Sequence, residues 1–184
     1  MTQNIYDNDA FFTGYSQLPR SLGGLDSAPE WPALRAMLPA LPGKSVLDLG
    51  CGYGWFCRWA AEAGAARVLG VDVSEKMLAQ ANAMGTHAAL QYARLDLEQL
   101  ALPPASYDLV YSSLAFHYIA GFDALLAAIR HGLKPGGKLV FSIEHPIFMA
   151  PRQPGWPMRK AANAGPSTVT SNKARASRTG WRPA

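Results

Sequence analysis

The sequence predicts an α/β fold with one doubly wound, mostly parallel sheet and helices on both of its faces. Short apolar segments alternate with helical segments at least four times along the chain. Right-handed crossovers between parallel strands place such helices against the sheet. The strand segments are apolar at successive positions, as in strands buried on both faces. A chain of 184 residues is long enough for one such domain.

Local patterns place the individual elements. Residues 29–41 are expected to form a helix, because a proline suits the first turn and Trp31, Leu34 and Leu38 recur at helical spacing. Ser74 is available as the N-cap of a later helix. The expected helices are residues 29–41, 55–65, 74–85 and 122–133, and the expected strands are residues 44–49, 67–72, 88–96, 107–114 and 138–145, with a turn at residues 133–137.

The chain divides into three regions by composition. Residues 1–28 mix aromatic side chains with turn residues, residues 29–150 form the expected α/β domain, and residues 151–184 are basic. All 13 acidic residues precede residue 145, whereas seven of the 17 Lys and Arg follow it, so the net charge of +4 belongs to the last region. That region holds few large apolar residues and is expected to be disordered.

Composition also excludes several classes of partner. The basic residues of the last region are not interleaved with aromatic side chains, so nucleic-acid binding is not expected, although a basic tail is one source of it. No apolar run could span a bilayer, and acids stand where a signal peptide needs positive charge. Cys51 and Cys57 lack zinc-ligand spacing and suggest no disulfide framework. We expect a cytoplasmic enzyme without a metal or a membrane partner.

A glycine-rich segment carries the first sign of function. Gly50, Gly52 and Gly54 follow the first strand and precede the first crossover helix. Ligands of open α/β sheets bind there, at the carboxyl ends of the strands. Glycines let a ligand approach the main chain, and the helix N-terminus offers free N–H groups. Asp72 ends the next strand, where a carboxylate can accept both hydroxyls of a ribose.

Two ligand classes compete for such a loop. A dinucleotide site favours the spacing G-x-G-x-x-G, with the pyrophosphate on the helix N-terminus. The spacing here is G-x-G-x-G, and Asp48 stands beside it. A carboxylate repels a pyrophosphate and attracts an ammonium or sulfonium group. A nicotinamide-dependent oxidoreductase is therefore a distant alternative.

Four segments in order extend this interpretation to a family. They read "VLDLGCGYG", "VLGVDVS", "YDLVYSSLAFHYI" and "LKPGGKLVFSIEHP". These segments closely resemble the successive motifs of class I S-adenosylmethionine-dependent methyltransferases, in the small-molecule "methyltransferase domain" branch. The resemblance implies a Rossmann-like sheet with strand order 3-2-1-4-5, S-adenosylmethionine as the cofactor and a small-molecule methyl acceptor. These motifs do not distinguish nitrogen, oxygen and carbon acceptors.

The resemblance also implies roles for single residues. Asp48 and the glycine loop would line the amino-acid end of the cofactor, and Asp72 would hold the ribose. Residues 1–28 would close over the cofactor as a lid, with Tyr6, Tyr15 and Arg20 as the candidate contacts. The implied cofactor-binding set is Asp48, Gly50, Cys51, Gly52, Gly54, Asp72, Val73, Met77, Asp96, Leu97, Ser112, Ser113, Leu114, Tyr15 and Arg20.

Three members of this set have other interpretations. Cys51 could be a nucleophile or, more simply, a small buried residue. Asp48 could cap the following helix, and Asp96 could be an ordinary surface acid after a strand. For Asp48, the three glycines that follow favour a ligand contact over a cap.

A sulfonium methyl group is already activated, so the enzyme mainly aligns nucleophile, methyl and sulfur. A general base is needed only where the nucleophile must lose a proton. His117 and His145 are the candidates, because each follows a strand. The alternatives are a packed histidine bonded to the backbone for His117 and an extended turn before a proline for His145. His87 and His131 are expected to be solvated.

The end of the chain departs from the family. Its members continue with further helix and an antiparallel hairpin that completes a seven-stranded sheet, and residues 158–184 do not resemble that continuation. A shifted reading frame can be written that does, so the hypothesis is a frameshift near residue 157 and a chain without the usual C-terminal hairpin. The fifth strand would then be an exposed edge. The alternative function is a truncated remnant that binds the cofactor weakly or not at all.

Overall fold

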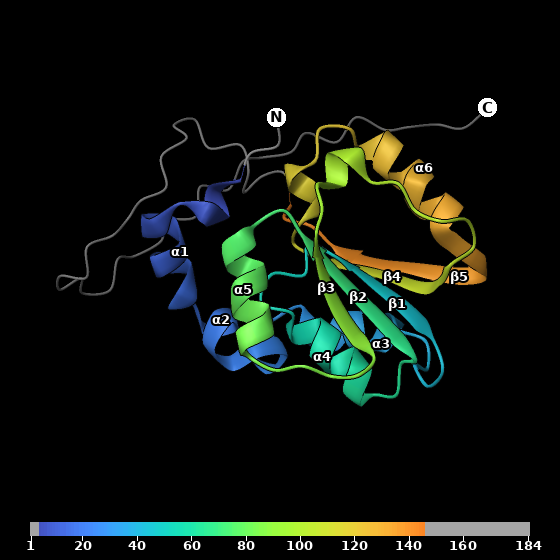
Figure 1. The fold of residues 1–184 in the computed structure, drawn as a ribbon, viewed down its shortest axis with the longest axis horizontal. Helices are drawn as coiled ribbons and strands as arrows, with labels where there is room; N and C mark the ends of the chain where they lie inside the picture. Colours follow the sequence, from blue (N-terminus) through green and yellow to red (C-terminus); the bar gives the residue numbers. More distant parts are fainter. Residues whose placement is uncertain (1–3, 146–184) are drawn as a thin grey trace, which may run out of the picture. The chain divides into compact units, whose positions relative to one another are not determined.

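A computed structural model of the chain describes residues 4–145 (Figure 1). The expectations for residues 151–184, and the hypothesis of a frameshift near residue 157, lie outside the described residues. In order along the chain, the elements are η1 Ile5–Asp7, α1 Asp9–Ser16, α2 Pro19–Gly23, η2 Gly24–Ser27, α3 Trp31–Met37, β1 Ser45–Leu49, α4 Trp55–Glu62, β2 Arg67–Asp72, α5 Glu75–Ala83, β3 Leu90–Arg94, η3 Leu97–Gln99, β4 Tyr107–Ser113, η4 Phe116–Tyr118, α6 Phe122–Gly132 and β5 Leu133–Ser142, where η marks a 3-10 helix.

The described strands form one sheet in the order β3-β2-β1-β4-β5, which confirms the predicted order. Every pairing is parallel, and β1 lies at the centre between β2 and β4. All five strands therefore end at the same edge of the sheet. Ligands of such sheets bind at this carboxyl edge, beside the strand where the order reverses, which here is β1.

Each face of the sheet carries its own apolar core. Val46 of β1 packs with α3 and α4, and its neighbour Leu47 packs with α6. Alternate residues of a strand point to opposite faces, so one buried strand serves both cores. Figure 1 shows the same division, with α6 on one face of the sheet and α3 and α4 on the other. On the α4 face, the ring of Tyr111 stacks on Phe56 with 3.6 Å between the ring centroids.

The N-terminal region contains more helix than residues 1–28 were expected to hold. The side chain of Asn8 accepts a hydrogen bond from the main-chain N–H of Phe11 and so caps α1. Pro19 occupies the first turn of α2, where its missing N–H costs nothing. The cap and the proline are ordinary start signals, but both helices are short, and neither has a long apolar period that could reveal it.

Several predicted boundaries differ from those in the structure, and two of the differences have a clear physical cause. The first is the end of α3, at Met37 instead of residue 41, because Leu38 precedes a proline and takes an extended backbone. The second is the predicted turn at residues 133–137, which is wrong as a separate turn because it belongs to β5. Pairing along β5 is still interrupted: Tyr107 faces Leu133, and the next paired residue on β5 is Lys138. The extra residues form an irregular bulge, which explains the turn-like sequence.

Candidate functional site

The glycine loop adopts a backbone that other residues rarely take. Gly50, Gly52 and Gly54 all have positive φ, at 75°, 52° and 69°. A Cβ atom at Gly50 would lie 2.5 Å from Cβ of Ala115, and one at Gly54 would lie 2.0 Å from the hydroxyl of Tyr92. A Cβ atom at Gly52 would meet nothing within 4 Å. The middle of the loop is therefore open, and its two ends are packed.

Asp72 fixes the open part of the loop to the next helix. Its Oδ2 accepts a hydrogen bond from the main-chain N–H of Gly52, and its Oδ1 accepts one from that of Ser74, both at 2.9 Å. Ser74 in turn caps α5 through the N–H of Met77. Burial raises the pKa of the Asp72 carboxyl group. The strand end, the loop and the first turn of α5 thus form one hydrogen-bonded unit.

Asp48 lies beneath the loop and is 2% exposed. Its Oδ2 accepts a hydrogen bond from the thiol of Cys57, at 3.1 Å. Burial raises the pKa of Asp48 to about 7; the Cys57 bond opposes this shift, and the charge of Asp72 adds to it. The N-terminus of α4 has Gly54 as its cap residue and receives no side-chain hydrogen bond, so the helix-cap interpretation of Asp48 is wrong.

Both described cysteines are free thiols packed inside the protein. The contact with Cys57 acts to lower the pKa of Cys51, but burial and the nearby carboxylates of Asp48 and Asp72 outweigh it, and the pKa is raised. A reactive cysteine needs the opposite environment, because the thiolate is the nucleophile. Cys51 therefore has the surroundings of a small buried residue.

Two further segments of the predicted set lie around β2 and β3. Val73 is half-buried, and Met77 is fully buried in the first turn of α5. The Oδ1 of Asp96 accepts a hydrogen bond from the N–H of Glu98 and caps η3. Leu97 packs into the core on the α6 face. Asp96 thus has a local structural role and remains half-exposed beside β3.

The predicted residues at the end of β4 differ in burial: Ser112 is buried, whereas Ser113 and Leu114 are half-buried. The hydroxyl of Ser112 donates to the carbonyl of Leu49, at 2.7 Å, inside the sheet. Ser113 donates to Oε1 of Glu30 at 3.1 Å and lies 3.2 Å from the hydroxyl of Ser142. Leu114 has a φ of 55°, which is unusual for a residue with a side chain. The chain therefore turns sharply at the position where β4 leaves the sheet.

The N-terminal region packs on the glycine loop and on α5, as a lid would. The ring of Tyr15 lies 5.7 Å from that of Tyr53 in the loop, and the ring of Tyr6 contacts that of Tyr15. Asp7 accepts hydrogen bonds from the hydroxyl of Ser74, at 2.5 Å, and from the N–H of Lys76, at 3.2 Å. These contacts bring Tyr6 and Tyr15 close enough to Asp72 for its charge to act on both phenols.

Arg20 is linked to the end of β4 through Glu30. Its guanidinium forms an ion pair with Glu30, which is the same carboxylate that accepts from Ser113. Burial acts to raise the pKa of Glu30, but hydrogen bonds and the charge of Arg20 outweigh it and lower the pKa. The pair forms a second polar cluster, beside β4 and β5 at the carboxyl edge.

The two candidate histidines differ in their surroundings. Both ring nitrogens of His117, on η4, are buried without a hydrogen-bond partner in the described structure. Burial lowers the pKa of His117, with a smaller opposing effect from Glu144. His145 is exposed after β5. His117 is therefore neutral near pH 7 and able to accept a proton.

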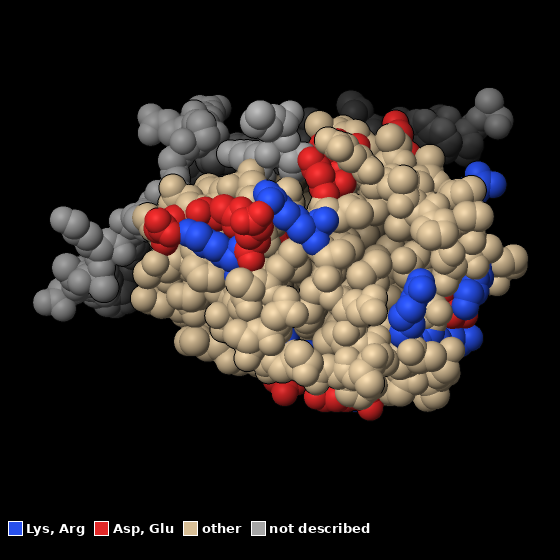
Figure 2. Space-filling view, viewed as in Figure 1, with Lys and Arg blue, Asp and Glu red and all other residues tan. Residues whose placement is uncertain are grey.

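Both acidic and basic side chains surround this site, so neither sign of charge predominates on its surface. Lys76 pairs with Asp9, and Arg94 pairs with Glu75. Figure 2 shows acidic and basic side chains lying next to one another on this part of the surface. Within residues 4–145, no group of three or more histidine, cysteine or acidic side chains could hold a metal ion.

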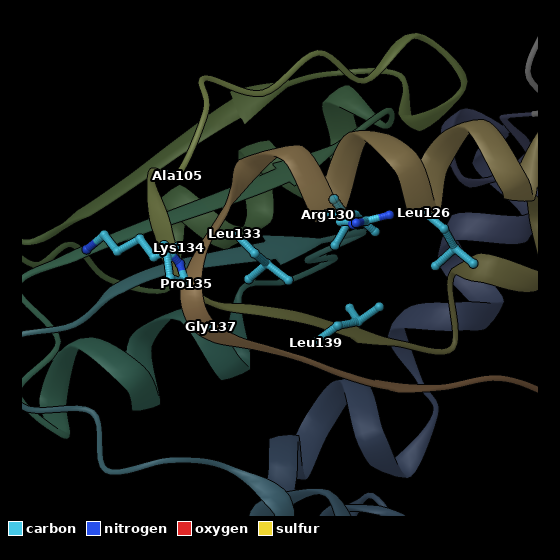
Figure 3. Close-up of a pocket in the computed structure, with 9 residues that line it drawn as sticks. Ala105, Leu126, Arg130, Leu133, Lys134, Pro135, Gly137 and Leu139 are labelled. Carbon is cyan, nitrogen blue, oxygen red and sulfur yellow. The ribbon is translucent and has the colours of Figure 1, made fainter.

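An open surface pocket of about 490 Å³ lies elsewhere, between α6 and the start of β5 (Figure 3). Leu126, Leu133 and Leu139 supply apolar walls, and Arg130 and Lys134 supply charge. None of the predicted site residues lines it. It lies toward the amino ends of β4 and β5, whereas the glycine loop and Asp72 lie at the carboxyl ends.

Sequence reasoning missed several residues that the fold brings to the site. Glu30, Tyr53 and Tyr118 contact predicted site residues through their side chains, and Asp7 accepts a hydrogen bond from Ser74, next to the predicted Val73. Tyr53 lies inside the glycine motif and could have been noticed there. Each of the other three residues contacts a partner more than 60 positions away along the chain. No local sequence pattern predicts such pairs.

Comparison with known proteins gives a consistent result. The family model described as "Methyltransferase domain" matches residues 47–141. An uncharacterized protein of Haemophilus influenzae is 43% identical over 151 residues, which cover 78% of this chain and 59% of that protein. A malonyl-[acyl-carrier protein] O-methyltransferase of Pectobacterium atrosepticum is 38% identical over 109 residues, covering 59% of this chain and 42% of that enzyme.

A solved structure is also similar. The S-adenosylmethionine-dependent methyltransferase from Mesorhizobium loti is 59% identical, with a TM-score of 0.68, and the match covers 72% of this chain and 61% of that one. The chain thus spans about two fifths to three fifths of the length of these relatives.

Proposed function

Since the chain belongs to the methyltransferase-domain family, whose model matches residues 47–141, we propose that it transfers a methyl group from S-adenosylmethionine to a small-molecule acceptor. The proposed cofactor site is the carboxyl edge of β1 and β2, where the glycine loop meets Asp72. The name of the similar Mesorhizobium loti protein supports this cofactor. The name of the Pectobacterium atrosepticum relative, a malonyl-[acyl-carrier protein] O-methyltransferase, supports methyl transfer as the reaction.

One observation carries the proposal: two buried carboxylates flank an open glycine loop. Asp48 lies beneath the loop and Asp72 holds its middle. Among the described residues, neither carboxylate forms a salt bridge. The ionised form of such a site repels a pyrophosphate, and a ligand that carries positive charge stabilises that ionised form. S-adenosylmethionine carries a sulfonium and an ammonium group, so its chemistry fits the residues present.

The chain's own residues would divide the work of binding. Asp72 would accept the ribose hydroxyls, and the loop with Asp48 would face the amino-acid end. Val73, Met77, Asp96 and Leu97 would lie toward the adenine; that assignment comes from family resemblance. When bound, the cofactor supplies an electrophilic methyl group. Binding and alignment of this kind can provide roughly 7–11 kcal/mol of the rate enhancement.

The N-terminal region and His117 would complete the site. Residues 5–16 pack over the loop and on the start of α5, where they would exclude water from the reacting groups. We propose His117 as the general base for acceptors that must lose a proton, because its ring nitrogens have no partner among the described residues. A base of this kind contributes about 10²–10⁴-fold. His145, exposed after β5, is the second candidate.

The proposed setting is the cytoplasm. No helix among residues 4–145 has both the length and the apolar character needed to cross a bilayer. We further propose that the partner is a small molecule and that nucleic acid is not bound.

Calorimetric titration with S-adenosylhomocysteine, the stable product, tests the proposal. We expect micromolar binding by the full chain and a loss of at least about tenfold in Asp72→Ala, because a charge-assisted contact is removed. Asp123→Ala is the matched control, since Asp123 is an exposed acid of the first turn of α6. Binding of a nicotinamide cofactor by a chain that ignores S-adenosylhomocysteine would overturn the assignment.

A further inference from the structure

The space beneath the glycine loop holds a closed group of acids and thiols. The carboxyl group of Asp48 is surrounded by Cys57 from α4, Cys51 from the loop, Asp72 from β2 and Tyr111 from β4. These are the titratable groups that act on it from the elements packed around β1. None of them is a cation, so no described side chain balances a negative charge on Asp48.

Only one described side-chain hydrogen bond reaches this carboxyl group, and it comes from Cys57. The thiol lies 3.1 Å from Oδ2, and the sulfur is completely buried. The position of the sulfur is fixed from the other side, because a Cβ atom on Gly70 would lie 2.7 Å from it. A thiol that donates to a carboxylate favours the ionised form of the acid. The bond therefore acts against the desolvation of Asp48.

We propose that Cys57 is a positioning residue for Asp48. We further propose that, through this Cys57–Asp48 pair, the binding of the cationic cofactor is coupled to the release of one proton from the Asp48 carboxyl group. The proposal rests on the proposed function, because it needs a cation above the loop. Before binding, a proton neutralises Asp48; when the sulfonium cofactor enters, that proton passes to water and the carboxylate balances the new charge. When the neutral thioether product remains, the carboxyl group takes a proton back from water.

The geometry explains why the coupling belongs to Asp48 and not to Asp72. Asp72 accepts two main-chain N–H bonds, which stabilise its charge without any ligand. Asp48 has only the weak thiol donor among described side chains. Burial raises the pKa of Asp48 to about 7, so a small change in its surroundings alters its charge under ordinary conditions. The Cys57 thiol is the described side chain that bonds to this carboxyl group, so its hydrogen bond affects the charge of Asp48.

Calorimetry in two buffers of different ionisation heat measures the coupling. The full chain is titrated with S-adenosylmethionine and with S-adenosylhomocysteine between about pH 6 and about pH 8, and the buffer dependence gives the protons released. The two ligands share an amino group, so their difference isolates the sulfonium charge. We expect S-adenosylmethionine to release a larger fraction of a proton near pH 7, and Asp48→Asn to abolish the difference between the ligands.

The Cys57 variants separate positioning from packing. In Cys57→Ala the acid loses its donor, so the pH of greatest proton release should move upward by about one unit. Cys57→Ser keeps a donor and should restore the original profile. Val46→Ala is the matched control, because Val46 is fully buried in the same core and its truncation leaves the thiol in place. Its profile should equal that of the unmodified chain.

Two results would overturn the proposal: equal proton release for both ligands, or an unchanged profile in Cys57→Ala. If neither nucleoside binds, the proposed function fails and the coupling fails with it. An NMR titration of carboxyl-labelled aspartate in the ligand-free chain distinguishes these failures. A carboxyl signal that titrates near pH 7, is absent from Asp48→Asn and moves in Cys57→Ala would support the positioning role even where the nucleosides do not bind. A signal unaffected by Cys57→Ala would refute that role.

Discussion

The hydroxyl oxygens of Tyr6 and Tyr118 lie 3.2 Å apart although 112 positions separate them in the chain. Tyr6 belongs to η1 near the start of the chain, and Tyr118 ends η4 after β4. Their rings meet edge to face with 6.2 Å between the centroids. The N-terminal region therefore joins the two sides of the carboxyl edge, since Asp7 beside Tyr6 also bonds to Ser74 and Lys76 at the start of α5.

We expect Asp7→Ala to loosen the N-terminal region without unfolding the sheet. The change removes the acceptor of two hydrogen bonds at the start of α5, each worth about 0.5–1.5 kcal/mol. Residues 5–16 should then exchange their amide hydrogens faster and be cleaved more readily by protease, whereas the exchange of β1 and β4 should not change. Hydrogen exchange measured by mass spectrometry tests this.

Asp9→Ala is the control for that experiment. Asp9 also pairs with Lys76, but its side chain is 99% exposed, and exposed ion pairs contribute little. We expect its exchange pattern to match that of the unmodified chain. Equal protection of residues 5–16 in Asp7→Ala and Asp9→Ala would show that Asp7 does not hold the region down.

The two glycine positions of the loop should respond differently to alanine. Gly54→Ala brings a methyl group to within 2.0 Å of the Tyr92 hydroxyl at a φ of 69°, and we expect it to cost about 2–4 kcal/mol of stability. Gly52→Ala has the strained φ but free space around the methyl, so the cost should be about 1–2 kcal/mol. Urea denaturation followed by tryptophan fluorescence gives both values.

Gly54→Ala should cost more stability than Gly52→Ala, but Gly52→Ala should weaken ligand binding more than Gly54→Ala does. If the open space at Gly52 is where the cofactor approaches the main chain, Gly52→Ala should weaken S-adenosylhomocysteine binding about tenfold or more while the chain stays folded. Calorimetry at a temperature where the variant is folded measures this. Unchanged affinity in Gly52→Ala would place the ligand elsewhere.

The strand order and the central loop could be predicted because their signals are local. Three glycines after an apolar strand permit the positive φ of a tight loop, and an acid at the end of the next strand needs no distant information to be noticed. The sheet order followed from recognising four motifs in sequence. The order of β3, β2, β1, β4 and β5 in the structure confirms that inference.

The remaining parts depend on contacts that no local pattern encodes. Glu30 joins Arg20 to Ser113, although the sequence predicts it only as an acid in the first turn of a helix. Asp48 was expected to face a ligand, but its partner in the structure is the thiol of Cys57, nine positions on and one layer away. Burial and partner choice are properties of the packed molecule, so the chemistry of a residue is harder to predict than its position.

The polar cluster beside β4 gives a further prediction. In Glu30→Ala, Arg20 loses its ion-pair partner and Ser113 loses its acceptor. Glu30→Gln keeps an acceptor for Ser113 and should lose less stability than Glu30→Ala, which we expect to cost about 1–3 kcal/mol because both partners are half-buried. Urea denaturation of the two variants tests the ranking. Equal losses would mean that the hydrogen bond from Ser113 contributes nothing.

Asp48 should make the stability of the chain depend on pH in an unusual direction. Burial raises its pKa to about 7, whereas an aspartate in the unfolded chain titrates near about 3.9. Between these values the folded state holds a proton that the unfolded state has lost. The contribution of this group to stability is therefore complete below the unfolded pKa, falls as the pH rises toward about 7, and is constant above it.

Asp48→Asn removes this titration while keeping the size of the side chain. We expect the variant to gain stability relative to the unmodified chain as the pH rises, by on the order of 1–4 kcal/mol at pH values above about 7, and to lose most of that advantage near about pH 5. Urea denaturation at several pH values gives the difference directly, and Asp123→Asn, at an exposed position, should show none. A difference between Asp48→Asn and the unmodified chain that stays constant with pH would mean that Asp48 is ionised throughout, and that the thiol of Cys57 stabilises its charge more strongly than burial opposes it.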